Sequence, residues 1–479
     1  MKISNVFYIL SRLWLILSIC LILPVPFSLY YRDGLHFIFI LTSIGIATVS
    51  IILNRLITTP SELSTKDGYL TVSLSWVSFS FIGAIPFLAS GAIPSLTDAY
   101  FETMSGFTTT GATILIDIEV IPKSLLFWRN MTQWLGGMGV IALAVAILPL
   151  LGVGGFQLFK AEAPGPTKDK IAPKISDTAK LLWMVYLFFT ALQTILLMLG
   201  GLGLFEALCI TFGTLATGGY APLNASIAAY PSQYIQYVII LFMFIAGVNF
   251  NLHYWALKGS PDKYLKNPEF RFFIGVILVS TLLITIIRII NGEEISEALI
   301  RSCLFQTVSI VTTTGFITEN YEQWPFVTQF MLLLLMFIGG CASSTGGAIK
   351  NIRICVLFKF LGNQLKKLFY PRGVFPVKVG DKAISEDIVA NIIAFIALYI
   401  LLFVAGVLVM TFIGLNIDTS IGAVAATLGN IGPGIGAVGP VENFAHIPKV
   451  GKWFLCFLML AGRLEIYTVF VLFTKRFWL

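Results

Sequence analysis

A short pattern ending in glycine occurs four times in this chain and constrains the fold more strongly than any other feature. Each copy follows a short apolar stretch and lies between two long apolar segments. The copies, whose glycines are 107, 97 and 117 residues apart, are Thr109-Thr110-Gly111, Ala216-Thr217-Gly218, Thr313-Thr314-Gly315 and Asn430-Ile431-Gly432. This spacing predicts four copies of one structural unit. Four such loops in one chain could form a single ring.

The composition excludes a soluble globular protein. Of the 479 residues, 57% are hydrophobic and only 11% are charged, which is typical of a polytopic membrane protein. The first apolar run, near residues 7–29, is long enough to cross a membrane and lacks a small-residue cleavage site. We therefore expect it to remain as the first helix.

Ten apolar segments are long enough to cross a bilayer, since a span needs about 20 residues. They lie near residues 7–30, 35–54, 69–91, 125–151, 181–203, 230–257, 269–290, 325–358, 386–413 and 448–474. Four shorter segments end at the glycine patterns and are expected to be re-entrant pore helices: 97–108, 204–215, 295–311 and 418–428. We predict an all-α polytopic membrane protein with two N-terminal helices and four repeats of span, pore helix and span around one pore. The expected units are residues 1–60, 61–165, 166–265, 266–375 and 376–479.

Lysine and arginine collect in the joins between the repeats. The three joins hold Lys160, Lys168, Lys170, Lys174 and Lys180, then Lys258, Lys263, Lys266 and Arg271, then eight basic residues between Lys350 and Lys382. By the positive-inside rule these joins are cytoplasmic, so both termini are expected there too and the glycine loops open to the outside. This bias largely accounts for the net charge of +7, so we do not read that charge as nucleic-acid binding.

The four glycine patterns have the chemistry of a cation filter. Non-helical backbone at membrane depth must have its carbonyls satisfied, and a ring of carbonyls can replace the water shell of a cation. Glycine permits the backbone angles that this requires, and the negative end of each short helix also favours a cation. Taken singly, threonine-glycine dipeptides are common in loops. Their recurrence at the same place in each unit favours the pore.

The eighth span contains a run of small and hydroxyl residues in which helix propensity collapses. The run is Gly339, Gly340, Cys341, Ala342, Ser343, Ser344, Thr345, Gly346 and Gly347. We expect two half-helices joined by a loop inside the membrane, which must line a cavity and could block or clear the path under the filter. The alternative is a kinked helix packed through its small residues.

Arg463 is expected in the middle of the last span, where a lone charge is costly and normally faces a partner or water. It could form an electrostatic barrier under the filter, held by carbonyls of residues 339–347. The alternative is a structural ion pair with Glu465 or Glu102. Arg129 is expected to be structural. Glu102 and Glu206 near pore-helix starts would favour the helix dipole and could concentrate cations, although capping alone would explain them.

No catalytic centre, disulfide or metal site is indicated. The six cysteines and three histidines have no C-x-x-C or ligand spacing. Residues 434–439 match the dinucleotide fingerprint, but that motif needs a strand before it and a helix after it, whereas a membrane loop precedes this copy and Pro440 follows. We expect neither enzymatic activity nor an organic cofactor on this chain.

Several segments resemble the superfamily of potassium transporters that includes the Trk, Ktr and plant HKT proteins. The matching motifs lie at residues 100–113, 128–139, 312–316, 429–434 and 461–465. The two leading helices fit the TrkH type, whose resemblance implies a filter for K+ as the transported ion when glycine occupies all four loops. The side-chain ring is incomplete at Ala216 and at Asn430-Ile431, so we expect selectivity less strict than in a true channel.

The resemblance also implies how the protein is assembled and controlled. Residues 339–347 are similar to the intramembrane gating loop of TrkH, and Arg463 matches a pore arginine. A homodimer in a bacterial cytoplasmic membrane is implied, with a cytosolic nucleotide-binding regulator of the TrkA type that could dock on the basic residues 359–382. The expected function is K+ uptake aided by the membrane potential. The alternatives are a secondary transporter coupling H+ or Na+ to K+, and a less selective monovalent cation channel.

Overall fold

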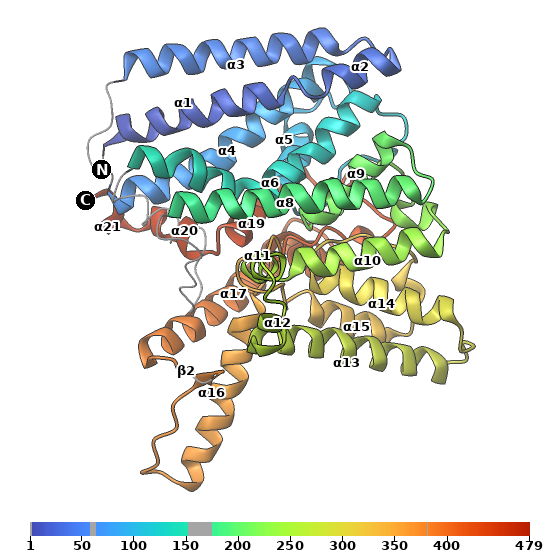
Figure 1. Ribbon diagram of the computed structural model, residues 1–479, viewed down its shortest axis with the longest axis vertical. Coiled ribbons are helices and arrows are strands. Elements are labelled where there is room, and N and C mark those ends of the chain that lie inside the picture. The colour runs from blue at the N-terminus through green and yellow to red at the C-terminus, as the bar shows by residue number, and fades with distance from the viewer. Residues whose placement is uncertain (1, 58–63, 152–174, 381) are drawn as a thin grey trace.

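The computed structural model describes residues 2–57, 64–151, 175–380 and 382–479. Within these ranges the secondary structure is helical except for a hairpin of β1 (Lys378–Val379) and β2 (Lys382–Ala383). Most helices run side by side, and the N-terminus lies close to the C-terminus at one end of them (Figure 1). The predicted all-α polytopic fold class is confirmed.

Two leading spans precede the repeats. The first is α1 (Ile3–Cys20) followed by α2 (Val25–Tyr31), and the second is α3 (His36–Leu56). The span expected at 7–30 is interrupted by turns at residues 21–24, where Pro24 starts α2. Because α1 packs between α3 and α4, these helices cover one side of the first repeat.

The four repeats follow in the expected order of span, short helix and span. Repeat 1 contains α4 (Thr65–Ala89), α5 (Leu96–Phe107) and α6 (Lys123–Leu151), and repeat 2 contains α8 (Ile175–Leu199), α9 (Leu204–Leu215), α10 (Gln233–Gly247), α11 (Phe250–Leu257) and α12 (Asp262–Lys266). Repeat 3 contains α13 (Pro268–Ile290), α14 (Glu297–Val311), α15 (Phe326–Leu335) and α16 (Asn351–Phe369). Repeat 4 contains α17 (Glu386–Phe412), α18 (Ile417–Leu428), α19 (Lys449–Arg463), α20 (Tyr467–Phe470) and α21 (Lys475–Trp478). Short 3-10 turns occur at Ser226–Ala229, Tyr321–Gln323, Gly436–Val438 and Val471–Phe473.

Each short helix carries an acidic residue in its first turn, where it stabilises the positive end of the helix dipole. These residues are Asp98, Glu206, Glu297 and Asp418. The expectation for Glu206 is therefore met, but Glu102 lies in the middle of α5. Its side chain is fully buried and paired with Arg129, so it does not act at the start of the helix.

Two spans predicted to be continuous are sharply bent. The span expected at 230–257 turns by 106° between α10 and α11, and the span expected at 448–474 turns by 114° after α19. Asn249 caps the new helix by accepting the N–H of Asn251 at 2.9 Å. At the second bend, Glu465 and Ile466 have φ of 56° and 53°, so two consecutive residues leave the helical region.

The third repeat is broken as predicted, but the interruption runs from residue 336 to residue 350 and so extends beyond the run at 339–347. We call residues 336–350 the intramembrane loop. Within the described residues, α6 alone among the four second spans is one unbroken helix.

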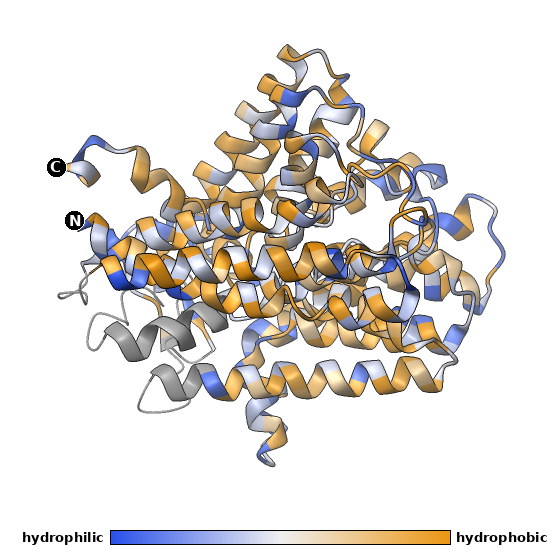
Figure 2. Ribbon diagram, turned by 90° about the horizontal axis from the view of Figure 1, so that it is seen from above, coloured by the Kyte–Doolittle hydropathy of each residue, from blue (hydrophilic) through white to orange (hydrophobic). Residues whose placement is uncertain are grey.

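The apolar surface of the helices fits a membrane environment. Six helices of the described chain are long and apolar enough to span a membrane. Two bent pairs of helices are also long and apolar enough if each pair is taken as one span. In Figure 2 apolar residues dominate the helices, whereas polar residues gather in the loops and near the termini. Two cores of buried apolar side chains lie inside, one formed mainly by the leading helices with repeats 1 and 4, the other by repeats 2 and 3.

Two helical glycines provide a test of the packing. A Cβ at Gly136 of α6 would overlap the backbone of Phe107 at the end of α5, whereas a Cβ at Gly275 of α13 would meet nothing within 4 Å. We expect Gly136→Ala to destabilise the protein by about 1–3 kcal/mol through overpacking. Gly275→Ala should leave stability unchanged or raise it, since alanine favours a helix by about 1 kcal/mol. Thermal unfolding in detergent measures both, and equal melting temperatures would contradict this packing.

Candidate ion pathway

The four glycine patterns adopt one backbone conformation. The second residue after the end of each short helix is left-handed, with φ of 53° at Thr109, 51° at Thr217, 60° at Thr313 and 52° at Asn430. Two residues later a glycine is left-handed in every loop: Gly111, Gly219, Gly315 and Gly432, with φ of 85°, 76°, 80° and 102°. The repeat seen in the sequence is therefore also a repeat of backbone geometry.

This geometry corrects the alignment of the second loop. Gly219, not Gly218, is equivalent to the other three glycines, and Thr217 is equivalent to Thr109. Gly218 occupies the position of Thr110, and both N–H groups bond to the carbonyl five residues back. The sequence pattern was misaligned because either glycine of the Gly218-Gly219 pair fits it. Ala216 is therefore equivalent to Thr108 and lies outside the triplet, and Asn430 alone differs from threonine at the left-handed position.

The four loops close into a ring. A Cβ built on the left-handed glycine of one loop would meet a backbone carbonyl of the next loop. The pairs are Gly111 with Gly218, Gly219 with Thr314, Gly315 with Ile431, and Gly432 with Thr110. The contacts pass through the repeats in chain order and return from the fourth to the first. A side chain at any of these glycines would push two loops apart.

Three of the four ring carbonyls lie in buried residues and have no donor within the described part of the chain. The hydrogen bonds described for this chain include no donor for the carbonyls of Thr110, Thr314 and Ile431, all in fully buried residues. The equivalent carbonyl of Gly218 accepts from Gln133 Nε2 at 2.6 Å. Buried backbone carbonyls need a partner, and a dehydrated cation is one that such a ring can hold.

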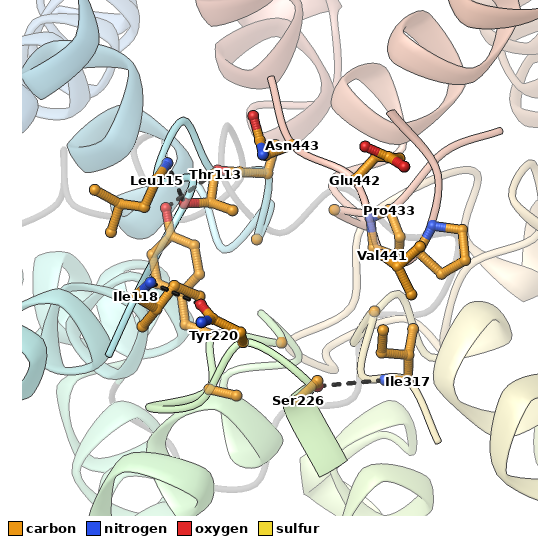
Figure 3. A pocket seen from close by; sticks show the side chains of 18 of the residues that line it. Thr113, Leu115, Ile118, Tyr220, Ser226, Ile317, Pro433, Val441, Glu442 and Asn443 are labelled. Atoms are coloured by element: carbon orange, nitrogen blue, oxygen red, sulfur yellow. Dashed lines mark hydrogen bonds between the residues drawn. The ribbon is translucent and has the colours of Figure 1, made fainter. Parts of the chain in front are cut away.

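A cavity of about 120 Å³ lies against the ring, and Gly111, Gly219, Gly315 and Gly432 all line it. The rest of the lining is formed mainly by residues that follow the glycines in each repeat. In Figure 3 the chains of the four repeats surround its opening, with Tyr220 on one side and Glu442 on the other. We call this cavity the vestibule.

A buried ion pair ties the first loop to the second. Arg129 Nε lies 2.7 Å from Glu102 Oε1, with side-chain exposures of 2% and 0%. Glu102 also accepts the N–H of Ile114 at 2.9 Å. Arg129 donates to the carbonyl of Ala221 at 3.2 Å and lies over the Tyr220 ring. Arg129 therefore has the structural contacts expected of it.

The intramembrane loop contacts the other side of the ring. Gly347 N donates to Thr313 Oγ1 at 2.7 Å, and Ala348 N donates to the carbonyl of Gly429 at 3.0 Å. Thr345 Oγ1 donates to the carbonyl of Leu215, the last residue of α9, at 3.0 Å. The loop thus lies where three of the short helices end.

Arg463 ends α19 rather than lying in the middle of a helix. Its guanidinium donates to the carbonyl of Thr345 at 2.7 Å and to that of Gly136 at 2.9 Å. Arg463 therefore joins the intramembrane loop to α6 through backbone carbonyls. The carboxylates considered as its partners have other cations, since Glu102 pairs with Arg129 and Glu465 pairs with Arg353.

Three polar residues of this region were not singled out from the sequence. Lys350 donates to the carbonyl of Gly346, Arg353 pairs with Glu465, and Gln133 holds the second loop. Lys350 and Arg353 directly follow the glycine-rich run, so their position next to a membrane break was a usable signal. Gln133 gave no comparable signal, because a lone glutamine in an apolar helix can have many partners.

The ring of four re-entrant loops, with the vestibule on one side and an intramembrane loop on the other, defines a membrane protein of the pore-loop class. The sequence model of the TrkH family, described as a cation transport protein, matches residues 36–478. The chain therefore belongs to the TrkH family, as the resemblance in its motifs indicated.

Individual relatives agree over their whole length. The chain is 42% identical to the Trk system potassium uptake protein TrkH of Salmonella typhimurium and 41% identical to that of Escherichia coli K12, with 98% of each chain covered. The crystal structure of the potassium transporter TrkH from Vibrio parahaemolyticus matches with a TM-score of 0.90 and 37% identity, covering 100% of both chains.

The buried pair of Glu102 and Arg129 predicts a distinct pattern of stability. Glu102→Gln leaves Arg129 without its counter-charge, so we expect a loss of about 3–5 kcal/mol. The double variant with Arg129→Met should lose less than Glu102→Gln alone. The control Asp262→Asn removes an exposed pair with Lys266, which should cost less than about 1 kcal/mol. Thermal unfolding of the purified variants tests the pattern, and equal losses for Glu102→Gln and Asp262→Asn would contradict it.

Proposed function

We propose that this chain takes up K+ through a carbonyl-lined filter formed by the four glycine loops. The filter consists of the four triplets recognised in the sequence, extended by Gly219 in the second loop. The observation that carries the proposal is the closed ring, whose buried carbonyls can coordinate a cation. The relation of the chain to potassium uptake proteins supports K+ as that cation. Four left-handed glycines at equivalent positions support selectivity for K+ over Na+.

The intramembrane loop and Arg463 form the gate of this proposal. Residues 339–347 lie against the inner side of the ring, and the Arg463 guanidinium is bound to one of their carbonyls. A cation leaving the filter on that side meets both a polypeptide and a fixed positive charge. Conduction therefore requires that the loop or the arginine move.

The family and the shape of the chain support a proposal for its assembly and control. Helix α16 projects from the body of the molecule (Figure 1) and carries Lys359, Lys366 and Lys367. Together with the basic residues up to Lys382, it offers a surface for a cytosolic nucleotide-binding subunit of the TrkA type. We place both termini and this projection on the cytoplasmic side of a bacterial inner membrane, and we take the working unit to be a homodimer.

Rubidium-86 uptake into proteoliposomes of the purified chain tests the filter. Excess K+ should block the uptake, whereas Na+ should block it weakly. Gly315→Ser should relax this preference, because φ is 80° there and a Cβ would meet the Ile431 carbonyl. Gly275→Ser, in open space on α13, is the matched control. Uptake that requires a Na+ or H+ gradient would favour the coupled transporter instead, and equal competition by Na+ would favour the less selective channel.

Removing the pore arginine should release the gate. We expect Arg463→Ala to raise uptake in the absence of any regulator by about tenfold, equivalent to a barrier lower by about 1.4 kcal/mol. The control is Lys359→Ala, which removes an exposed lysine of α16 and should leave this uptake unchanged. The rate of rubidium-86 uptake per reconstituted protein measures both variants, and an unchanged rate for Arg463→Ala would remove this residue from the gate.

A further inference from the structure

The second loop lacks an internal bond that braces two of the others. In the first loop the hydroxyls of Thr108 and Thr110 lie 2.8 Å apart, and in the third loop those of Thr312 and Thr314 also lie 2.8 Å apart. Each bond joins the end of the short helix to the ring. The equivalent residues of the second loop, Ala216 and Gly218, have no hydroxyl, so this loop needs a different constraint.

Gln133 supplies such a constraint from outside the loop. Its Nε2 donates to the carbonyl of Gly218 at 2.6 Å, and its Oε1 accepts the N–H of Tyr220 at 2.9 Å. The glutamine is fully buried in α6. Both ends of one amide group therefore hold the backbone on either side of Gly219, the left-handed glycine of the ring.

The fit between Gln133 and the loop is close. The three heavy atoms nearest to a Cβ at Gly218 would all belong to the Gln133 amide, at 2.5 to 2.7 Å. Gly218 has ordinary backbone angles, so the need for glycine arises from this contact and not from its conformation. One turn earlier on the same face of α6, Arg129 binds the carbonyl of Ala221 at 3.2 Å. The side chains of α6 thus bind the second loop from residue 218 to residue 221.

We propose that Gln133 is a positioning residue that sets the ion selectivity of the pore by holding the second filter loop in the conformation of its neighbours. It takes the place of the threonine pair in the first and third loops. Selectivity depends on the number and the placement of the coordinating carbonyls, and such a site is held by the residues behind it. Without the two hydrogen bonds from Gln133, the carbonyls of the second loop can move closer to a smaller ion. This inference rests on the proposed function of the ring.

The test compares Gln133→Met with the parent chain. Methionine is close in size but cannot hold the loop by two hydrogen bonds. Full-length protein is reconstituted, and rubidium-86 uptake is measured against increasing K+ or Na+. The ratio of the Na+ and K+ concentrations that halve the uptake should fall at least about fivefold, since one buried hydrogen bond is equivalent to about that factor and the variant loses two. Gln236→Met is the matched control, since its amide also holds a buried carbonyl, that of Tyr230 at 3.0 Å. The ratio of the Na+ and K+ concentrations that halve the uptake should not change in Gln236→Met.

A double-variant cycle separates positioning from general damage. In Gly218→Ala the added methyl displaces the Gln133 amide. The ratio of the Na+ and K+ concentrations that halve the uptake should therefore fall in this variant as it does in Gln133→Met. The combination should fall no further, because both changes break one contact. Additive losses, or a loss of uptake with an unchanged ratio, would overturn the proposal. Gln133→Asn, too short to bridge both backbone groups, serves if the methionine variant does not elute as folded protein.

Gly315→Ser distinguishes this failure from failure of the filter itself. If Gly315→Ser relaxes the ratio while Gln133→Met and Gly218→Ala do not, the filter proposal stands and the role of Gln133 is refuted. If none of the three changes the ratio, the four loops are not the filter, and the proposal for Gln133 falls with them.

Discussion

Backbone carbonyls inside a membrane protein must find a hydrogen-bond donor or a cation, because the lipid offers neither. In this chain the ring formed by Thr110, Gly218, Thr314 and Ile431 concentrates that need at one place. The surrounding structure supports the ring: short helices direct their negative ends to it, the buried pair of Glu102 and Arg129 holds the exits of the first two loops, and a broken helix brings the intramembrane loop beneath it. The fold is best understood as the support for this ring of carbonyls.

Much of this architecture could be predicted because it is periodic or because it violates a strong local rule. The short helix at 204–215 agrees with α9 residue by residue, since an apolar stretch between glycines has clear ends. The break in the third repeat was also predictable, because nine small and hydroxyl residues cannot continue a membrane helix without cost. Resemblance to a known family added the TrkH type, which the comparisons confirmed.

The remaining features depend on contacts between residues distant in sequence. The alignment of Gly218 and Gly219 could not be decided locally, since each glycine satisfies the pattern and only the ring distinguishes them. The bends after Gly247 and Arg463 were missed because apolar residues continue on both sides, so hydropathy bridges the break. The partner of Glu465 is Arg353, which is 112 residues away, and no spacing rule relates the two.

The placement of four loops in one polypeptide has a consequence for how such a pore changes. In an assembly of four identical subunits, one codon change alters every quarter of the ring at once. Here a change alters one quarter, and the other three retain their geometry. The unbroken α6 with its glutamine supports a single loop, while the three broken spans belong to the other repeats. If the ring is the filter that we propose, ion preference can change in small steps, one quarter at a time, and the four sides can specialise, one in rigidity and another in movement.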